Sequence, residues 1–368
     1  MDSITQAALG GVVGELVLGR KIGWKGMAWG LFFGTLPDLD ILLMPFMDQA
    51  ERLRWHRGIS HSIVMMFVAA LVFAKPLAWV HREKGVSARR AGWFVFLAWS
   101  THVLIDVFTS YGTQVFEPFS DRRVAWSNVF IIDLFFTLPL LVCLFYWPWK
   151  VVAHGWARRT WRKEGEDPDE EPEFPEFTRR CAAAAISVSC LYVVFTLVMK
   201  LWAVDQMKTQ MVEAVPGGTL VTVAPTVSNA LLWRGLIETK AGYFLTYWSP
   251  FDDGPAGYDY VPKQRELAAK FEGEKMFEAL KWFTEGHWVA RELPDGRVVM
   301  VDMRLGEVRD VEGKQMLPIF QWRMRYDEDG KSEVEQYRPQ DFEMKKAMGL
   351  IFERIGGKRT EWESMESF

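Results

Sequence analysis

The chain has 368 residues, of which 49% are hydrophobic, and its formal net charge is -4 at pH 7. Nothing in this balance predicts a nucleic-acid partner, and a mean hydropathy of -0.02 would suit a soluble enzyme. The average hides two halves. Up to about residue 203 the chain is a series of long apolar runs, whereas from Asp205 onward no run reaches the roughly 18 residues that span a bilayer. The sequence predicts a membrane domain followed by a soluble one.

Six apolar segments of the first half are close to the roughly 20 residues that a helix needs to cross a bilayer. They lie at about 2–19, 24–44, 59–80, 91–110, 129–149 and 181–203. The predicted fold class is an α-helical polytopic membrane domain, with about six transmembrane helices, followed by a soluble α+β domain. The predicted parts are a membrane metal-site domain over 1–149, a cytoplasmic linker over 150–180, a last transmembrane helix over 181–203 and an accessory domain over 204–368.

The first two segments carry small residues at regular intervals. Gly10 and Gly14 repeat at a spacing of four residues in the first segment, and Gly26, Gly30 and Gly34 do so in the second. Such residues let two helix backbones approach closely in a membrane, so a tight hairpin is predicted. The first segment starts with an acid and has no basic n-region, so it is predicted to be a retained helix and not a cleaved signal.

Basic residues predict the orientation, because Lys and Arg are retained on the cytoplasmic side of a membrane. The loops at 20–25, 82–90 and 150–180 hold most of them. We expect those loops in the cytoplasm and both termini outside, with the C-terminal domain in the periplasm. The alternate loops, 45–58 and 111–128, hold a smaller set of arginines. The expected location is the bacterial inner membrane.

Ionisable side chains gather in four short stretches of the apolar half. Such groups are costly in a membrane and are seldom there without a partner or a task. In the predicted topology all of them fall at the outer face. Carboxylates and imidazoles together are the ligands of a Zn or Mn site, so we predict one buried divalent metal centre, with Zn expected and Mn as the alternative. The predicted ligands are Asp38, Asp40, His56, His61, His102 and Asp106, with Asp2, Gln6 and Asp133 as additional candidates.

Local spacing bears on this prediction. His102 and Asp106 are four residues apart, so on one helix they share a face and can bind one metal. Asp38 and Asp40 follow a proline and could converge only in irregular backbone. The alternative is that His and Asp residues of the bundle pair with each other or with backbone carbonyls. For Asp133, a charge at a helix N-terminus is an equal alternative.

The same residues carry a family resemblance. Four stretches of the chain together resemble the bacterial inner-membrane metal-dependent hydrolases of the YdjM type. They are Met1–Gly10, Pro37–Asp40, His56–Ser62 and His102–Asp106, the last followed by Tyr111-Gly112. The resemblance covers roughly residues 1–150. That family in turn resembles, distantly, the zinc-dependent phospholipase C and S1/P1 nuclease group, which hydrolyses phosphoesters. Many family members have His where this chain has Gln6, so the number of metals near the N-terminus stays open.

Chemical roles follow in outline from the ligand types. A metal held by His and Asp lowers the pKa of its bound water toward about 7 and supplies hydroxide. Asp40 or Asp38 is the first candidate for a general base, since two acids so close need not both bind metal. Arg57, Arg122 and Arg123 could clamp an anionic group such as phosphate, with interfacial anchoring or charge pairing in the loop as equal alternatives.

The predicted position of the site suggests its substrate. A centre near the outer leaflet suits a membrane lipid or a lipid-linked intermediate, and a hydrophilic periplasmic substrate stays open. Three function classes compete: a membrane-embedded metal-dependent hydrolase, which we favour, a metal-ion transporter and a non-catalytic membrane scaffold. A transporter predicts ligands spread along a path through the bilayer, which the clustering at one face disfavours. A scaffold predicts that the cluster satisfies itself without metal. The oligomeric state stays open.

The C-terminal region, about 205–368, has the length of one domain and a mixed α and β pattern. Strands are predicted over 220–224, 231–238 and 243–248, and the Asp295-Gly296 pair predicts a hairpin. The apolar positions of 263–285 predict one amphipathic helix. The region contains no cysteine and a single histidine, His287, so no metal site of its own is expected. It is predicted to cap the membrane site, bind substrate or recruit a partner.

Overall fold

The computed structural model describes residues 1–146, 175–309, 316–327, 329–337 and 344–358. The chain divides into two compact units. The first comprises Met1–Leu42, His56–Ala125 and Ile131–Val194, and the second comprises Leu43–Trp55, Trp126–Phe130 and Phe195–Phe368. Most of the cytoplasmic linker predicted over 150–180 lies outside the described residues.

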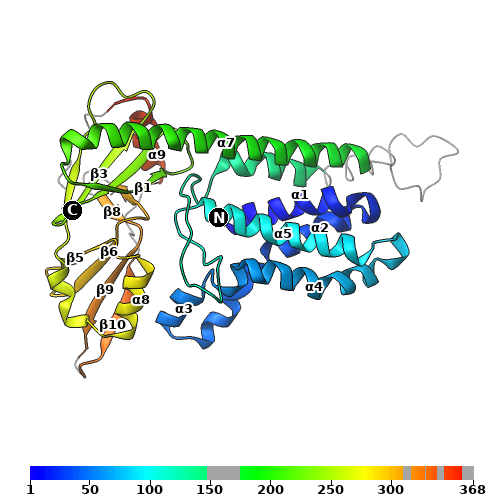
Figure 1. The fold of residues 1–368 in the computed structure, drawn as a ribbon, viewed down its shortest axis with the longest axis horizontal. Helices are drawn as coiled ribbons and strands as arrows, with labels where there is room; N and C mark the ends of the chain where they lie inside the picture. Colours follow the sequence, from blue (N-terminus) through cyan, green and yellow to red (C-terminus); the bar gives the residue numbers. More distant parts are fainter. Residues whose placement is uncertain (147–174, 310–315, 328, 338–343, 359–368) are drawn as a thin grey trace. The chain divides into compact units, whose positions relative to one another are not determined.

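The first unit is helical. Figure 1 shows its long helices α1, α2, α4 and α5 side by side, and the first half of the 40-residue helix α7 belongs to the same unit. The helices are α1 (Ser3–Ile22), α2 (Trp24–Thr35), η1 (Leu36–Phe46), η2 (Ile59–His61), α4 (Ile63–Val80), η3 (Arg82–Lys84), α5 (Ala88–Phe108), the helix Leu134–Tyr146 and α7 (Pro175–Ala214). The last residues of η1 and the second half of α7 belong to the second unit.

Four helices of the described part are long and apolar enough to cross a membrane. They are Trp24–Phe46, Ile63–Val80, Ala88–Phe108 and Phe177–Ala214. The predicted count of about six is not confirmed. Helix α1 has 20 residues, but Glu15, Arg20 and Lys21 make it less apolar than these four. The helix expected over 129–149 begins only at Leu134, and its described part ends at Tyr146.

The predicted hairpin of the first two helices is confirmed. A Cβ atom added at Gly30 would lie 2.1 Å from the carbonyl oxygen of Gly10, and one added at Gly14 would lie 2.1 Å from that of Gly26. No side chain fits at these positions, so the backbones of α1 and α2 are in direct contact. The contact brings the end of α2, at Gly34, next to the beginning of α1, and both ends contribute to the site described below.

The described part of the second unit contains two four-stranded antiparallel sheets, with strand orders β1-β2-β3-β4 and β10-β9-β6-β5. Leu236 and Leu245 of the first sheet and Val289 and Val301 of the second belong to one buried apolar core. The strands are β1 (Thr219–Pro225), β2 (Trp233–Glu238), β3 (Gly242–Trp248), β4 (Asp259–Pro262), β5 (Trp288–Glu292), β6 (Val298–Asp302), β9 (Gln321–Tyr326) and β10 (Ser332–Tyr337), and the short pair β7 (Glu307–Arg309) and β8 (Met316–Pro318). The helices are α3 (Gln49–Trp55), η4 (Arg265–Phe271), α8 (Lys275–Phe283) and α9 (Met344–Ile355).

The local predictions for this unit had mixed outcomes. The hairpin at Asp295-Gly296 is confirmed: it joins β5 to β6, and Gly296 takes the positive φ of 77° that such a turn needs. The single helix expected over 263–285 is wrong. The chain forms η4 and then α8, because Gly273 between them adopts a φ of 87°, which a helix does not accommodate.

Candidate metal centre

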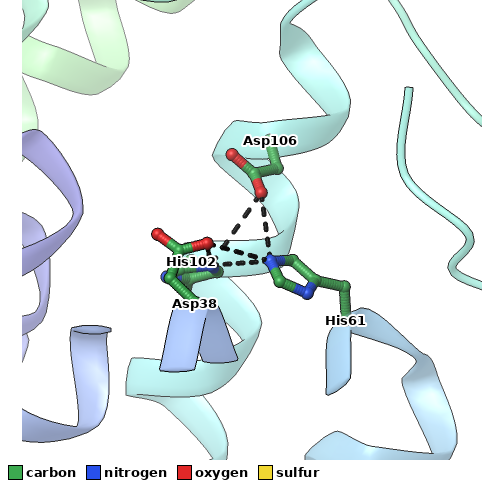
Figure 2. A group of neighbouring side chains, drawn as sticks. All are labelled: Asp38, His61, His102 and Asp106. Atoms are coloured by element: carbon green, nitrogen blue, oxygen red, sulfur yellow. Dashed lines mark hydrogen bonds and ion pairs between the residues drawn. The ribbon is translucent and has the colours of Figure 1, made fainter. Parts of the chain in front are cut away.

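Four predicted ligands converge in the first unit (Figure 2). Asp38 comes from η1, His61 from the end of η2, and His102 and Asp106 from one face of α5. One ligand atom of each residue lies within 4.8 Å of the others. The side chains of His61, His102 and Asp106 are fully buried, and that of Asp38 is 17% exposed. The group is therefore buried, and Asp38 is the member that solvent reaches.

The distances within this group fit a small ion. The Nε2 atoms of His61 and His102 are 3.1 Å apart, and each also faces carboxylate oxygens of Asp38 and Asp106. From His61 Nε2 these oxygens lie at 3.4 Å and 3.4 Å, and from His102 Nε2 at 3.6 Å and 3.8 Å. A tetrahedral zinc ion at its usual bond lengths separates its ligand atoms by about 3.3 Å. The residues present therefore fit a divalent ion.

The tautomer of His102 leaves its inner nitrogen free to bind metal. Its Nδ1 lies 2.7 Å from the carbonyl oxygen of Gly34, which can only accept a hydrogen bond. Nδ1 must therefore carry the proton, and Nε2 presents a lone pair to the centre of the group. This outer hydrogen bond to a backbone carbonyl is the usual way in which proteins orient a metal-binding histidine.

Hydrogen-bond contacts through Ser60 orient His61. Ser60 Oγ donates a hydrogen bond to Asp40 Oδ2 at 3.4 Å and lies 2.9 Å from His61 Nδ1. A Ser60 hydroxyl that donates to Asp40 accepts from Nδ1, and in that tautomer His61 Nε2 keeps its lone pair. Two lone pairs facing each other at 3.1 Å repel unless a cation or a proton lies between them. The geometry thus calls for a positive charge at the centre.

Asp106 is held by several donors besides the histidines. Gln6 Nε2 donates to its Oδ1 at 2.8 Å, and the amino group of Met1 forms an ion pair with the same oxygen. Arg57 Nε lies 3.3 Å from Oδ2. Gln6, an additional candidate ligand, is therefore placed as a hydrogen-bond donor to a ligand and not in the group of four.

Asp40 and His56 form a pair outside the group of four. His56 Nδ1 lies 3.3 Å from Asp40 Oδ1, and the backbone N–H of Arg57 donates to Asp40 Oδ2 at 3.0 Å. The side chain of Asp40 is 2% exposed and that of His56 is 27% exposed. In this arrangement Asp40 holds the loop that carries His61, and both of its oxygens are occupied.

The remaining additional candidates, Asp2 and Asp133, cap helices. Asp2 accepts from the backbone N–H of Thr5 at 2.9 Å, at the start of α1. Asp133 Oδ1 accepts from the backbone N–H groups of Phe135 and Phe136, and its Oδ2 accepts from the hydroxyl of Tyr192 at 2.8 Å. The alternative of a helix N-terminal charge is thus how the structure places Asp133.

The predicted arginines differ in position. Arg57 and Arg123 are buried, and both guanidinium groups lie over the ring of Tyr111, at 4.8 Å and 4.9 Å from its centroid. Arg122 is exposed. The structure therefore brings two of the three arginines to one aromatic side chain, and one of them, Arg57, lies 3.3 Å from Asp106.

Sequence reasoning missed the groups that orient the ligands. Ser60 lies inside the stretch His56–Ser62, and its position next to His61 could have drawn attention to it. The carbonyl of Gly34 gave a weaker signal, because every residue has a backbone carbonyl and the sequence cannot single one out. The ring of Tyr111 also gave a weaker signal, because aromatic side chains are common at a membrane interface.

The comparisons with known proteins bear on the same region. A family model described as "YdjM inner membrane protein" matches residues 1–203, more than half of the 368 residues. The chain belongs to this family. The match contains all four residues of the group and the four candidate spans at least in part. It supports the predicted resemblance to YdjM proteins and the assignment to an inner membrane.

A curated relative gives less information. The chain is 28% identical over 154 residues to "Uncharacterized protein YfhP" of Bacillus subtilis (strain 168). The match covers 40% of this chain and 46% of that protein, which is less than half of the relative. No solved structure matches. The more distant resemblance to phospholipase C and S1/P1 nuclease is not supported by these matches and stays a prediction.

Proposed function

We propose that this chain is a membrane-embedded metal-dependent hydrolase that acts on a phosphoester or lipid-related substrate at the outer face of the inner membrane. The observation that carries the proposal is the convergence of four ligand atoms at separations of 3.1–3.8 Å for the five pairs that involve a histidine. The hydrogen bond to Gly34 turns the Nε2 lone pair of His102 inward, and Ser60 Oγ lies 2.9 Å from Nδ1 of His61. In this proposal the C-terminal domain lies in the periplasm.

The residues divide the work as follows. Asp38, His61, His102 and Asp106 would hold the ion, with zinc expected and manganese as the alternative. A bound ion of this kind supplies hydroxide near neutral pH by lowering the pKa of its water, and polarises the bond to be broken. Gly34 and Ser60 hold the two imidazoles, and Asp40 holds the loop. Both oxygens of Asp40 are occupied, so Asp38, the most exposed of the four ligands, would be the general base only in a state in which it no longer binds the ion.

One observation favours a second candidate function. Catalytic zinc sites commonly have three protein ligands and leave one position for water, whereas structural sites are closed by four. Four side chains converge here, which would suit a metal-binding scaffold without catalysis. The exposure of Asp38 favours the hydrolase, because a ligand that solvent reaches can yield a coordination position or the ion can accept a fifth ligand.

The first test is elemental analysis of the full chain, purified in detergent. We expect close to one Zn or Mn per chain in the wild type and its loss in the double variant His102→Ala, Asp106→Ala. Asp133→Asn is the matched control, because it alters a buried carboxylate of the same unit that caps a helix, and it should keep the metal. No metal in the wild type, even after reloading, would overturn the proposal.

A second measurement separates the two candidate functions. Hydrolysis of phosphoester and lipid substrates is followed with and without a chelator. Activity that disappears with the metal and returns on reloading supports the hydrolase. Stoichiometric metal without any hydrolysis of these substrates favours the scaffold.

A further inference from the structure

Arg57 is a buried arginine in an unusual backbone conformation. It is 4% exposed and has a φ of 57°, in the left-handed region that non-glycine residues seldom adopt. Two hydrogen bonds hold it there: its N–H donates to Asp40 Oδ2 at 3.0 Å, and its carbonyl accepts from the N–H of Gln114 at 3.0 Å. Such a conformation costs energy and persists only where the surroundings impose it, commonly at functional sites.

The side chain of Arg57 is directed to the metal ligands, yet its donors are not used. Nε lies 3.3 Å from Asp106 Oδ2, without hydrogen-bond geometry, and Nε and Nη1 are buried and have no hydrogen-bond partner among the described residues. Buried N–H groups without a partner are costly, because each has lost its hydrogen bonds to water. Arg57 thus presents unsatisfied donors next to the proposed metal centre.

Another buried arginine of the chain, Arg304, uses its donors fully, whereas Arg234, paired through Nε with Glu307, keeps Nη1 and Nη2 buried without a partner among the described residues. Arg304 is 8% exposed, and all three of its guanidinium nitrogens are bonded: Nη1 to Glu285 at 2.7 Å, Nη2 to Asp302 at 2.8 Å and Nε to Asp302 at 3.2 Å. Arg57 has one loose ion-pair contact instead. Arg57 therefore lies within ion-pair distance of Asp106 and still has donors left for a further acceptor.

Charge balance points the same way. The carboxylates of Asp38 and Asp106 together match the charge of one divalent ion. Once such an ion is bound, Asp106 needs no further positive partner, and the charge of Arg57 becomes available to an anionic ligand. Arginine suits phosphate in particular, because its planar fork of N–H groups matches two phosphate oxygens.

We propose that Arg57 is the phosphoryl-binding residue of this site. The molecules that bind here would carry a phosphate group, which would lie between the guanidinium of Arg57 and the metal centre. The inference rests on the proposed function and names its substrate class. The ring of Tyr111, which lies against both Arg57 and Arg123, helps to hold the Arg57 guanidinium through a cation–π contact at 4.8 Å. Phosphate on a soluble molecule and phosphate in a lipid headgroup share this chemistry.

Phosphate binding to the zinc-loaded full chain in maltoside detergent tests the inference. The probes are inorganic phosphate and dihexanoyl phosphatidic acid, followed by calorimetry, with zinc content measured on every sample. The main variant is Arg57→Asn, because asparagine tolerates a positive φ and removes the guanidinium. Arg57→Lys keeps the charge without the fork. Arg89→Asn, at an exposed arginine near the start of α5, is the matched control.

We expect the wild type to bind the probes, and Arg89→Asn to bind each probe as tightly as the wild type does. Arg57→Asn should keep its zinc and bind the phosphoryl probes at least tenfold more weakly, with Arg57→Lys between the two. Tighter binding of the lipid than of inorganic phosphate, lost in the same variant, would identify a lipid headgroup as the source. Equal binding would identify the phosphoryl group alone.

Several results would overturn the inference. One is phosphate binding by Arg57→Asn at wild-type strength, and another is loss of zinc from that variant, which would make Arg57 a support of the ligands. If Arg57→Asn does not fold, phosphate binding by Arg57→Lys at wild-type strength would overturn the proposed role of the guanidinium N–H groups. Zinc in the wild type without binding of either probe would overturn this inference alone, whereas absence of zinc would overturn the proposed function as well.

Discussion

The two units of the chain bury charged groups in different ways. In the second unit, Arg234 donates from Nε to both carboxylate oxygens of Glu307, at 2.8 Å and 2.9 Å, and Tyr247 donates to the same carboxylate. In the first unit, the Nε2 atoms of His61 and His102 face each other at 3.1 Å. Their Nδ1 atoms lie on the outer side, next to Ser60 Oγ and the carbonyl oxygen of Gly34. The first pattern is closed in that both carboxylate oxygens of Glu307 accept bonds from the chain, although Nη1 and Nη2 of Arg234 have no partner among the described residues. The second pattern is open, because it leaves two imidazole nitrogens that a cation or a proton between them would satisfy.

This difference teaches how a binding site can be separated from a structural charge pair. Burying charged groups is costly in either case, and a structural pair offsets the cost within the chain. A site offsets it only when its ligand is bound.

The largest effect is expected where the closed pattern is broken. Burial by itself lowers the pKa of Arg234, but the charge of Glu307 raises it above its ordinary value, so the arginine stays charged. Arg234→Ala leaves Glu307 buried without its partner and should destabilise the second unit by about 3–5 kcal/mol. Hydrogen exchange of β2 and β3 in the full chain measures it.

An exposed ion pair provides the control for Arg234→Ala. Arg325 donates to Glu333 across β9 and β10 at 2.7 Å, and both side chains are about half exposed. Its removal in Arg325→Ala should cost less than about 1 kcal/mol. Equal losses in the two variants would show that burial does not distinguish these pairs.

The next effect concerns the open pattern in the first unit. A ligand that binds only the folded chain stabilises it by about 2.7 kcal/mol at a hundredfold excess over its dissociation constant. Zinc should therefore raise the thermal unfolding midpoint of the wild type, and a chelator should lower it. His61→Ala should show neither change. An unchanged midpoint in the wild type would mean that the group satisfies itself, as in the scaffold alternative.

The ligand types could be predicted from the sequence, but their division could not. His102 and Asp106 are set four apart on a helix, and this spacing predicts a shared face wherever α5 forms. Asp38 and Asp40 lie instead in the 3-10 helix η1, in which three residues make one turn. Side chains that are two residues apart in such a helix point in different directions. Asp38 therefore reaches His61, and Asp40 reaches His56.

The same limit applies to the fold. The glycine spacing predicted the contact of α1 and α2, because only glycine permits backbones so close. Apolar periodicity predicted one helix over 263–285. The apolar pattern continues across Gly273, but the backbone turns at that residue, so the chain forms two helices. Periodicity reports which face is buried and does not report whether the chain stays helical between two buried turns.

A third prediction concerns the hairpin that brings the ends of α1 and α2 to the site. An added methyl group at Gly30 would meet the backbone of Gly10, which cannot move aside as a side chain could. Gly30→Ala should therefore destabilise the first unit by about 1–3 kcal/mol. The measurement is the thermal unfolding midpoint together with the zinc content, which should fall if the hairpin positions Gly34 against His102.

A glycine of α9 gives the opposite sign and serves as the control. Gly349 lies inside a helix, and a Cβ added there would meet nothing within 4 Å. Gly349→Ala should stabilise the second unit by about 0.5–1 kcal/mol, because alanine favours the helix. Destabilisation by both substitutions, to a similar extent, would argue against the close contact of α1 and α2 as the cause.

The smallest effect is expected at His287, where burial and charge pairing oppose each other. Burial lowers the pKa of His287 below its ordinary value of 6.5, although Glu238, Glu285 and Asp302 act in the other direction and Arg304 adds to the lowering. Between the folded and the unfolded pKa, the unfolded chain therefore binds a proton that the folded chain does not. The free energy of unfolding is then highest above pH 6.5 and falls as the pH is lowered from 7 to 5.5.

Hydrogen exchange of β2 and β5 in the full chain at these two pH values measures the effect, and His287→Gln should remove it. His287 Nδ1 lies 3.2 Å from a carboxylate oxygen of Glu238, and the side chain is 25% exposed, so the loss should be smaller than any of the above. Stronger protection at the lower pH would mean that the ion pair with Glu238 outweighs burial. His287 would then belong with the closed pattern of Arg234 and Glu307, and a partly exposed histidine would suffice to complete a charge pair in this unit.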